Sequence, residues 1–214
     1  MALQARAEAT RRKIIETAVE LFGQFGYGET GLADVLQRAG VSKGAFYYHF
    51  DSKEAVATAI IEEFNNRAGI AVSENFDPAA PTLDGIIKST FAVQCLMHLD
   101  PITQIGQKLS QALNQVSSAG ARVYAGWTVA FVEMADGVAR AGGLCPGVDP
   151  LDVGEAIWAG VLGSHLVSAA CGDDPYVRLA RSWRVLVLSI APQPEVGRLH
   201  GLLDDIVEGY QAAV

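Results

Sequence analysis

Apolar residues recur three and four positions apart along most of this chain, which is the pattern of amphipathic α-helices. In the first such segment, residues 7–25, the apolar positions are Ile14, Ile15, Ala18, Leu21, Phe22 and Phe25. The same spacing predicts later helices at residues 51–67, 83–98, 101–116, 119–141, 151–171, 175–190 and 195–212. Groups of glycine and proline separate them, and residues 185–190 are the one apolar run that a strand could claim. The pattern therefore predicts an all-α fold.

Two short helices with a tight turn between them are predicted after the first helix. Thr30 is a suitable N-cap for a helix that ends at Gly40, and Ser42 is a suitable N-cap for another over residues 43–50. Only two residues separate the two helices. This is the helix-turn-helix layout, in which the N-terminal residues of the second helix reach base edges in the major groove of DNA.

Charge divides the chain into two parts. The 214 residues carry 16 Lys and Arg against 24 Asp and Glu, a net charge of −8, and half of them are hydrophobic. Up to Lys53 there are seven basic and six acidic residues, a net charge of +1, which leaves −9 for the remainder. A protein this acidic does not coat nucleic acid or an anionic membrane. The division of charge is what we expect if only residues 1–53 meet a polyanion such as nucleic acid and residues 54–214 do not.

Several classes of protein are excluded by what the sequence lacks. Cys95, Cys145 and Cys171 form no CxxC pair, and the histidines show no metal-ligand spacing, so we expect no disulfide framework, no metal and no cofactor. The N-terminal segment has no apolar stretch of a signal peptide, and residues 156–172 are too short and too polar to span a membrane. These observations favour a cytoplasmic protein that does not contact a membrane.

Residues 40–44 also match the GxSxG motif of serine hydrolases. That motif requires a strand before the serine, and an acid and a histidine later in the chain. Here a helical pattern precedes Ser42, and His49 lies only seven residues further on, within the same short helix. We therefore expect that the protein is not an enzyme.

The segment over residues 30–54 contains the blocks AGVSKG and YYHF in order, and it resembles the DNA-binding domain of the tetracycline-repressor (TetR) family. The resemblance implies an all-α homodimer that represses transcription on a double-stranded operator until a small molecule binds. It implies a helix-turn-helix DNA-binding domain over residues 1–53 and a larger ligand-binding and dimerisation domain over residues 54–214. The expected DNA contacts are Thr30, Ser42, Lys43, Gly44, Ala45, Tyr47, Tyr48, His49 and Lys53. Lys43 is suited to guanine, and Gly44 allows the backbone to come close. The alternative for either tyrosine, Tyr48 above all, is packing against the first helix.

The rest of the chain resembles the γ-butyrolactone receptors that control antibiotic production in filamentous bacteria. The resemblance is carried by residues 89–101, 126–127, 161–167 and 182–192. It implies a lactone-like inducer and a tryptophan over the lactone ring, which corresponds to Trp127. The expected ligand site consists of Trp127, Thr90, Gln94, Val123 and Phe131. Gln107 is a further candidate for the pocket lining, but it is expected to face solvent instead. The alternatives are that Trp127 is an ordinary core residue, and that the ligand is another small apolar molecule or has been changed or lost.

The helix predicted at 151–171 is apolar around most of its circumference. A helix of this kind must bury two faces, one against its own domain and one against a partner. We expect an intersubunit four-helix bundle completed by Trp183, Leu186 and Ile190 of the next helix. The alternative is a monomer with a thicker bundle.

Overall fold

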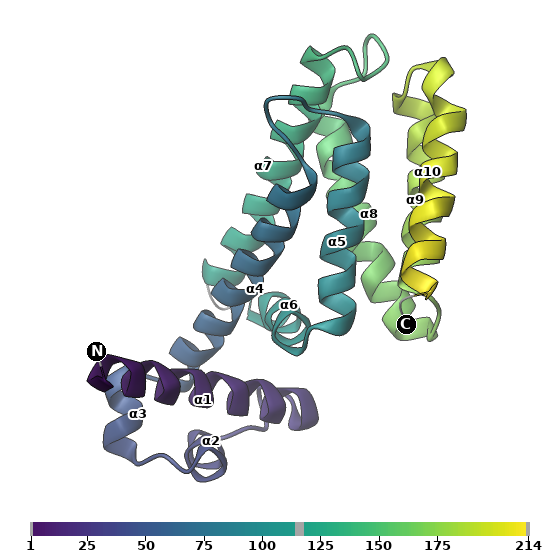
Figure 1. Cartoon of the computed structure of the whole chain (residues 1–214). Coiled ribbons are helices and arrows are strands. Elements are labelled where there is room, and N and C mark those ends of the chain that lie inside the picture. The colour runs from purple at the N-terminus through teal and green to yellow at the C-terminus, as the bar shows by residue number, and fades with distance from the viewer. Residues whose placement is uncertain (1, 114–117, 213–214) are drawn as a thin grey trace. The chain divides into compact units, whose positions relative to one another are not determined.

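A computed structural model of the chain describes residues 2–113 and 118–212, and within these ranges all regular structure is helical (Figure 1). The helices are α1 (Ala2–Phe25), α2 (Leu32–Ala39), α3 (Lys43–His49), α4 (Lys53–Asn75), α5 (Leu83–Leu99), α6 (Pro101–Leu113), α7 (Ser118–Arg140), α8 (Pro150–Cys171), α9 (Pro175–Ile190) and α10 (Gln193–Ala212). The all-α prediction is confirmed. Residues 114–116, predicted as the end of the sixth helix, lie outside the described residues.

The chain divides into two compact units, each made of two segments. The first unit contains Met1–Arg67 and Asp100–Arg122, and the second contains Ala68–Leu99 and Val123–Val214. The chain therefore passes between the units within α4, between α5 and α6, and within α7. The predicted boundary after residue 53 falls inside the first unit, where α4 begins, and it stays a prediction about which segment binds DNA.

In the first unit α1 contacts α2, α3 and α6, and α2 and α3 both lie below α1 in Figure 1. Gly26 and Gly40 have positive φ angles of 86° and 61°, and these left-handed residues end α1 and α2. The largest buried side chains are contributed by α1, α3 and α4 and include Ile14, Phe22, Phe46, Ile60 and Phe64. The two short helices are thus fixed on α1 through an apolar core.

The same unit holds α6 tightly against α4. A Cβ at Gly106 would lie 2.5 Å from the Cβ of Phe64 and 2.9 Å from the carbonyl oxygen of Ile60, so the two backbones approach closely. Arg67 of α4 pairs with Asp100 at 2.7 Å, and the other carboxylate oxygen of Asp100 caps α6. A displacement of α6 would therefore act directly on α4.

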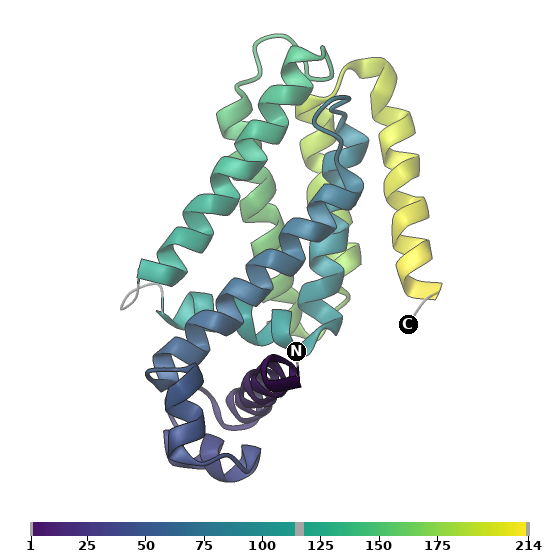
Figure 2. The same cartoon turned by 60° about the vertical axis from the view of Figure 1, so that its left-hand side comes forward.

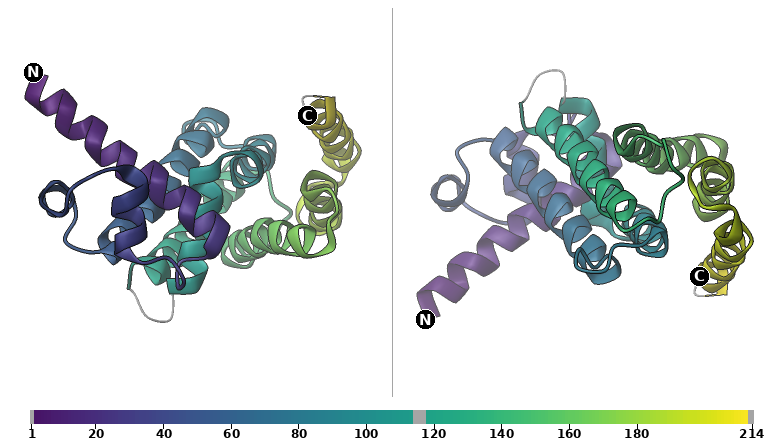
Figure 3. Two further views of the ribbon diagram at one scale, coloured as in Figure 1. Left: turned by 90° about the horizontal axis from the view of Figure 1, so that it is seen from below. Right: turned by 90° about the horizontal axis from the view of Figure 1, so that it is seen from above.

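In the second unit α8, α9 and α10 lie in a row, and α5 contacts all three (Figures 2 and 3). Arg198 of α10 donates two hydrogen bonds of 2.7 Å to Asp84 of α5, and these bonds lower the pKa of the Asp84 carboxyl. The core between these helices includes Ile86, Phe91, Leu179, Val187 and Leu199. This core supports α5, which carries Thr90 and Gln94 of the expected ligand site.

The close contact between α7 and α8 gives a first testable prediction. A Cβ at Gly154 would lie 2.5 Å from both the Cα and the backbone nitrogen of Val132, atoms that cannot turn away. We expect Gly154→Ala to lower the free energy of unfolding by ~1–3 kcal/mol. Gly201→Ala on α10 is the control, because a Cβ there meets nothing within 4 Å. Denaturant unfolding that gives both variants equal stability would refute the contact.

Candidate DNA interface and ligand site

The first turn of α3 is exposed and well formed. Ser42 is the N-cap, and its hydroxyl oxygen accepts a hydrogen bond from the backbone nitrogen of Ala45 at 3.2 Å. Lys43 and Gly44 are exposed, and Ala45 is half-buried. A Cβ at Gly44 would meet nothing within 4 Å, so the fold itself does not require glycine there. The end of the helix that the sequence assigned to base contacts is free for a partner.

The remainder of α3 separates core residues from exposed ones. Phe46 is fully buried and Phe50 is 6% exposed, so both belong to the core of the first unit. Tyr47 is 53% exposed and Tyr48 77% exposed, so neither tyrosine is packed into the core against α1 as the alternative proposed. The His49 ring is half-buried and lies edge-on to Tyr48, with 4.9 Å between the ring centroids.

Two expected DNA contacts have other roles in the structure. Thr30 is 2% exposed, and its hydroxyl donates to the carbonyl oxygen of Gly26 at 2.8 Å, so it is not available to a phosphate. Lys53 donates from Nζ to the carbonyl oxygens of Tyr27 (2.8 Å) and Thr30 (2.7 Å) and lies over the Tyr27 ring. Burial raises the pKa of the Tyr27 phenol, and the charge of Glu54 raises it further. Lys53, the first residue of α4, therefore stabilises the loop over residues 26–31 that precedes α2.

A cluster of aromatic rings surrounds Trp127 in the second unit. Trp127 is 6% exposed, and its ring centroid lies 5.9 Å from that of Trp158 in a stacked arrangement and 6.0 Å from that of Phe131. Phe131 also stacks on Trp158, and Val123 is buried one turn before Trp127. Trp158 was not among the residues expected from the sequence, because periodicity shows that the helix over residues 151–171 is apolar but not which side chains of other helices it meets.

The expected polar members of the ligand site differ in how fully they are hydrogen-bonded. The hydroxyl of Thr90 donates to the carbonyl oxygen of Ile87 (2.7 Å) and accepts from Nε1 of Trp183 (2.8 Å), so Thr90 is committed to the core. Gln94 is fully buried, and its Nε2 lies 3.3 Å from Nδ1 of His165. The expectation for Gln107 of the first unit is wrong, because this residue is only 2% exposed.

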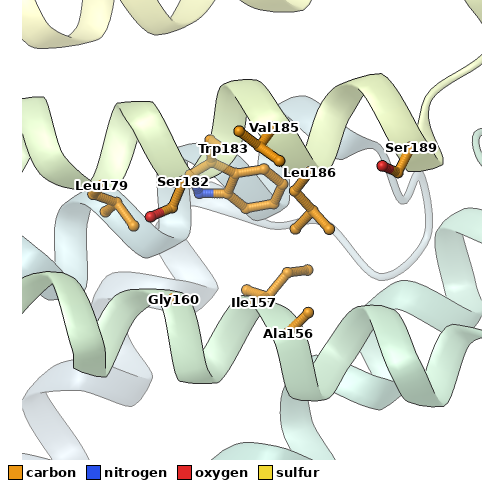
Figure 4. A pocket seen from close by; sticks show the side chains of 9 residues that line it. All are labelled: Ala156, Ile157, Gly160, Leu179, Ser182, Trp183, Val185, Leu186 and Ser189. Atoms are coloured by element: carbon orange, nitrogen blue, oxygen red, sulfur yellow. The ribbon is translucent and has the colours of Figure 1, made fainter.

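The outer faces of α8 and α9 form an open groove of about 230 Å³, which Figure 4 shows from close by. Trp183 lines this groove, but it is only 2% exposed and Ile190 only 3%, so their own protomer covers most of both side chains and they offer a partner little surface, contrary to expectation. The exposed apolar residues of the two helices are Leu151, Leu166, Val167, Val185 and Leu188. These residues replace Trp183 and Ile190 as the candidate partner face.

The structure also bears on the serine-hydrolase motif and on membrane-spanning helices. Residues 40–44, which match GxSxG, run from the end of α2 into the first turn of α3. No strand precedes them in the described part of the chain, so the geometry of a hydrolase nucleophile is absent there. Among residues 2–113 and 118–212, no helix is long and apolar enough to cross a membrane.

Comparison with known sequences assigns both parts of the chain. Residues 14–60 match the model of the bacterial regulatory proteins of the tetR family. The A-factor receptor protein of Streptomyces griseus is 33% identical over 193 residues, which are 89% of this chain and 67% of that relative. A probable acrEF/envCD operon repressor of Escherichia coli K12 is 46% identical over 55 residues, a quarter of each chain.

Comparison with solved structures gives the same result. A γ-butyrolactone receptor described as an ArpA-like protein has a TM-score of 0.78 at 25% identity, over 96% of this chain and 99% of the other. CprB of Streptomyces coelicolor, a TetR family protein solved in complex with its operator sequence, has a TM-score of 0.76 at 27% identity, over 94% and 98%. The exposed first turn of α3, the aromatic cluster around Trp127 and these similarities lead to one conclusion: the chain belongs to the tetR family of bacterial regulatory proteins, which are transcriptional regulators and not enzymes.

Proposed function

We propose that the protein is a transcriptional repressor that binds a pseudo-palindromic operator as a dimer and is released by a small molecule of the γ-butyrolactone type. The observation that carries this proposal is the similarity to the A-factor receptor protein, which extends over 89% of the chain and so includes both units. TetR-family regulators bind DNA and small molecules and are dimers. The aromatic cluster around Trp127 supports a γ-butyrolactone as the small molecule, because aromatic walls suit a small, mostly apolar ligand.

The function is tested with DNA from upstream of the protein's own gene and of its neighbours. Fluorescence anisotropy is expected to find a palindrome that the protein binds specifically, and a synthetic γ-butyrolactone is expected to reverse that binding. Specific binding that only other small apolar molecules reverse would replace the lactone with another ligand. Absence of specific binding to every palindrome would overturn the repressor itself.

The proposed DNA-contact set is the exposed part of α3 and its N-cap: Ser42, Lys43, Gly44, Ala45, Tyr47, Tyr48 and His49. Lys43 can donate to O6 and N7 of guanine in the major groove, and the absence of a side chain at Gly44 lets the backbone approach the DNA. The phenol groups and the imidazole can donate to phosphates, which fix the position of the helix on the duplex.

A base contact and a phosphate contact have different signatures in binding measurements. Lys43→Ala is expected to lose ~1–3 kcal/mol of discrimination at one operator position, while discrimination at the other positions is retained. Tyr47→Phe is the matched variant, because it removes one phosphate donor and is expected to weaken binding to all sequences alike. Anisotropy titrations against an operator set with single base changes provide the measurement. A uniform loss for Lys43→Ala would assign Lys43 to a phosphate instead.

Release requires that the ligand bind the conformation that is incompetent for DNA more tightly than the competent one. The chain offers a route for this coupling, because α4 begins directly after α3 and continues into the second unit. Within the first unit α6 is fixed to α4 at Gly106 and through the Arg67–Asp100 ion pair. A shift of α5 or α7 on ligand binding would therefore reach α3 through α6 and α4.

A further inference from the structure

A second group of aromatic rings in the second unit is contributed by α5, α9 and α10. The Tyr210 ring of α10 stacks on two others, with its centroid 4.7 Å from that of Tyr176 on α9 and 6.3 Å from that of Phe91 on α5. Cys95 follows Phe91 by four residues on α5 and therefore lies on the same face of that helix. A thiol thus accompanies this aromatic group.

The hydroxyl group of Tyr176 is a buried donor without a good acceptor. Tyr176 is 3% exposed, and its hydroxyl makes no hydrogen bond of ordinary geometry to a described residue. The Cys95 side chain interacts with this hydroxyl, but sulfur is only a weak acceptor. Burial raises the pKa of the Tyr176 phenol, and the neighbouring Cys95 raises it further, so the hydroxyl keeps its proton at neutral pH. Such a donor calls for a stronger acceptor beside the thiol.

Tyr176 is held in place by the start of α9. Oδ1 of Asp174 accepts a hydrogen bond of 2.8 Å from the backbone nitrogen of Tyr176, and Oδ2 accepts one of 2.8 Å from Nε2 of Gln211 on α10. The His98 ring of α5 lies edge-on to the Tyr176 ring, with 5.8 Å between the centroids. With its backbone bonded and both sides of its ring in contact, Tyr176 is fixed beside Cys95.

The surroundings of the three cysteines differ. Sγ of Cys145 donates to the carbonyl oxygen of Ala191 at 3.1 Å, and Cys171 is exposed at the last residue of α8. Cys95 is half-buried, so a small reagent can reach it. Within the described part of the chain, it is the cysteine that interacts with an unpaired hydroxyl. An oxygen atom added to its sulfur would gain a donor that is already in position.

We propose that Cys95 is a modification site, at which a small hydroperoxide oxidises the thiol to a sulfenic acid whose oxygen accepts a hydrogen bond from Tyr176. The thiolate sulfur attacks one peroxide oxygen, so that an S–O bond forms and the O–O bond breaks. Sulfur loses two electrons and the peroxide gains them, and the second oxygen leaves as hydroxide or alkoxide and takes a proton from solvent. Two molecules of a small thiol reverse the step, with a disulfide and water as products. The proposal does not depend on the proposed function.

Labelling with dimedone, which reacts with sulfenic acids, tests the proposal. Protein that carries Cys145→Ser and Cys171→Ser has one thiol, and serine at position 145 retains a donor for Ala191. After brief treatment with hydrogen peroxide, mass spectrometry is expected to find dimedone on Cys95. Tyr176→Phe in this single-thiol protein is expected to shorten the lifetime of the sulfenic acid roughly 10-fold, because its oxygen loses the donor.

Tyr210→Phe is the matched control, because it also replaces a tyrosine of the stack but removes a hydroxyl that is not among the unpaired buried atoms. It is expected to leave the lifetime unchanged. A Cys95 that forms no sulfenic acid would overturn the proposal. Equal lifetimes with tyrosine and phenylalanine at position 176 would also overturn it.

Thermal unfolding of the single-thiol protein provides a measurement that needs no substitution at position 176. Oxidation is expected to raise the Tm by about 2–4 °C, since the Tyr176 hydroxyl gains an acceptor. In Tyr176→Phe we expect oxidation to give no rise, and we expect the two reduced proteins to melt within about two degrees of each other, because the hydroxyl removed is unpaired. A Tm that oxidation lowers in the protein with Tyr176, or raises equally in both, would overturn the proposal.

Discussion

Leu188→Asp is expected to convert the protein into a monomer and to weaken operator binding by about 10²- to 10⁴-fold. Leu188 is 58% exposed on α9, beside Val185, which is 68% exposed, so the protomer itself does not use these side chains. A carboxylate at this position would be buried without a partner in a dimer. Two DNA-binding units must contact successive major grooves about 34–36 Å apart, and a monomer provides only one.

Light scattering distinguishes a 22.7 kDa monomer from a particle of twice that mass, and anisotropy measures operator affinity on the same samples. Circular dichroism verifies that the variant is folded. Ile70→Asp is the control, because Ile70 is a similarly exposed apolar residue on α4 and is expected to leave mass and affinity unchanged. A wild type that is monomeric at micromolar concentration would contradict the proposed interface, and so would a Leu188→Asp variant that remains a dimer.

Trp127→Phe is expected to leave operator affinity nearly unchanged and to weaken release by a γ-butyrolactone by about 5- to 150-fold, the usual range of allosteric coupling. The operator contacts are proposed in the first unit, whereas Trp127 belongs to the second. The substitution removes the indole N–H and part of the ring surface that stacks on Trp158. Phenylalanine is preferred over alanine, because loss of a buried tryptophan costs about 3–5 kcal/mol and would unfold part of the protein.

A titration of the repressor–operator complex with the lactone measures the effect. Trp183→Phe is the matched control, because Trp183 is also buried but its N–H is bound to Thr90. We expect this control to lose stability while keeping its response to the lactone. If Trp127→Phe is released as readily as the wild type, Trp127 is a core residue and the sensing role belongs elsewhere.

Helical periodicity predicted the existence of the helices well, because each buries an apolar face, but it did not predict the length of α4. Asn65, Asn66 and Gly69 lower the intrinsic helix propensity around residue 67. The helix nevertheless continues to Asn75, and Ala68 and Ala71 on it are buried. Tertiary packing thus overrides a weak local preference.

At the DNA interface and the ligand site, the sequence also predicted less about side-chain contacts than about helices. The resemblance to the TetR family gave Lys43 and Tyr47 as DNA contacts, and both are exposed on α3. Hydrogen bonds from Lys53 to loop carbonyls have no sequence signal, since any nearby carbonyl oxygen can accept. The bond between Trp183 and Thr90 joins residues 93 positions apart, and periodicity gives the face of a helix but not the partner of a side chain.

The capped first turn of α3 has a consequence for how such proteins diverge. Ser42 holds the turn through the backbone of Ala45, and the side-chain positions of Lys43 and Gly44 carry no packing. Substitutions at these two positions are therefore free of the constraint that folding places on Phe46. Mutation can alter the operator that is read while the scaffold and the ligand response persist, so that duplicated copies of one gene can acquire separate target genes.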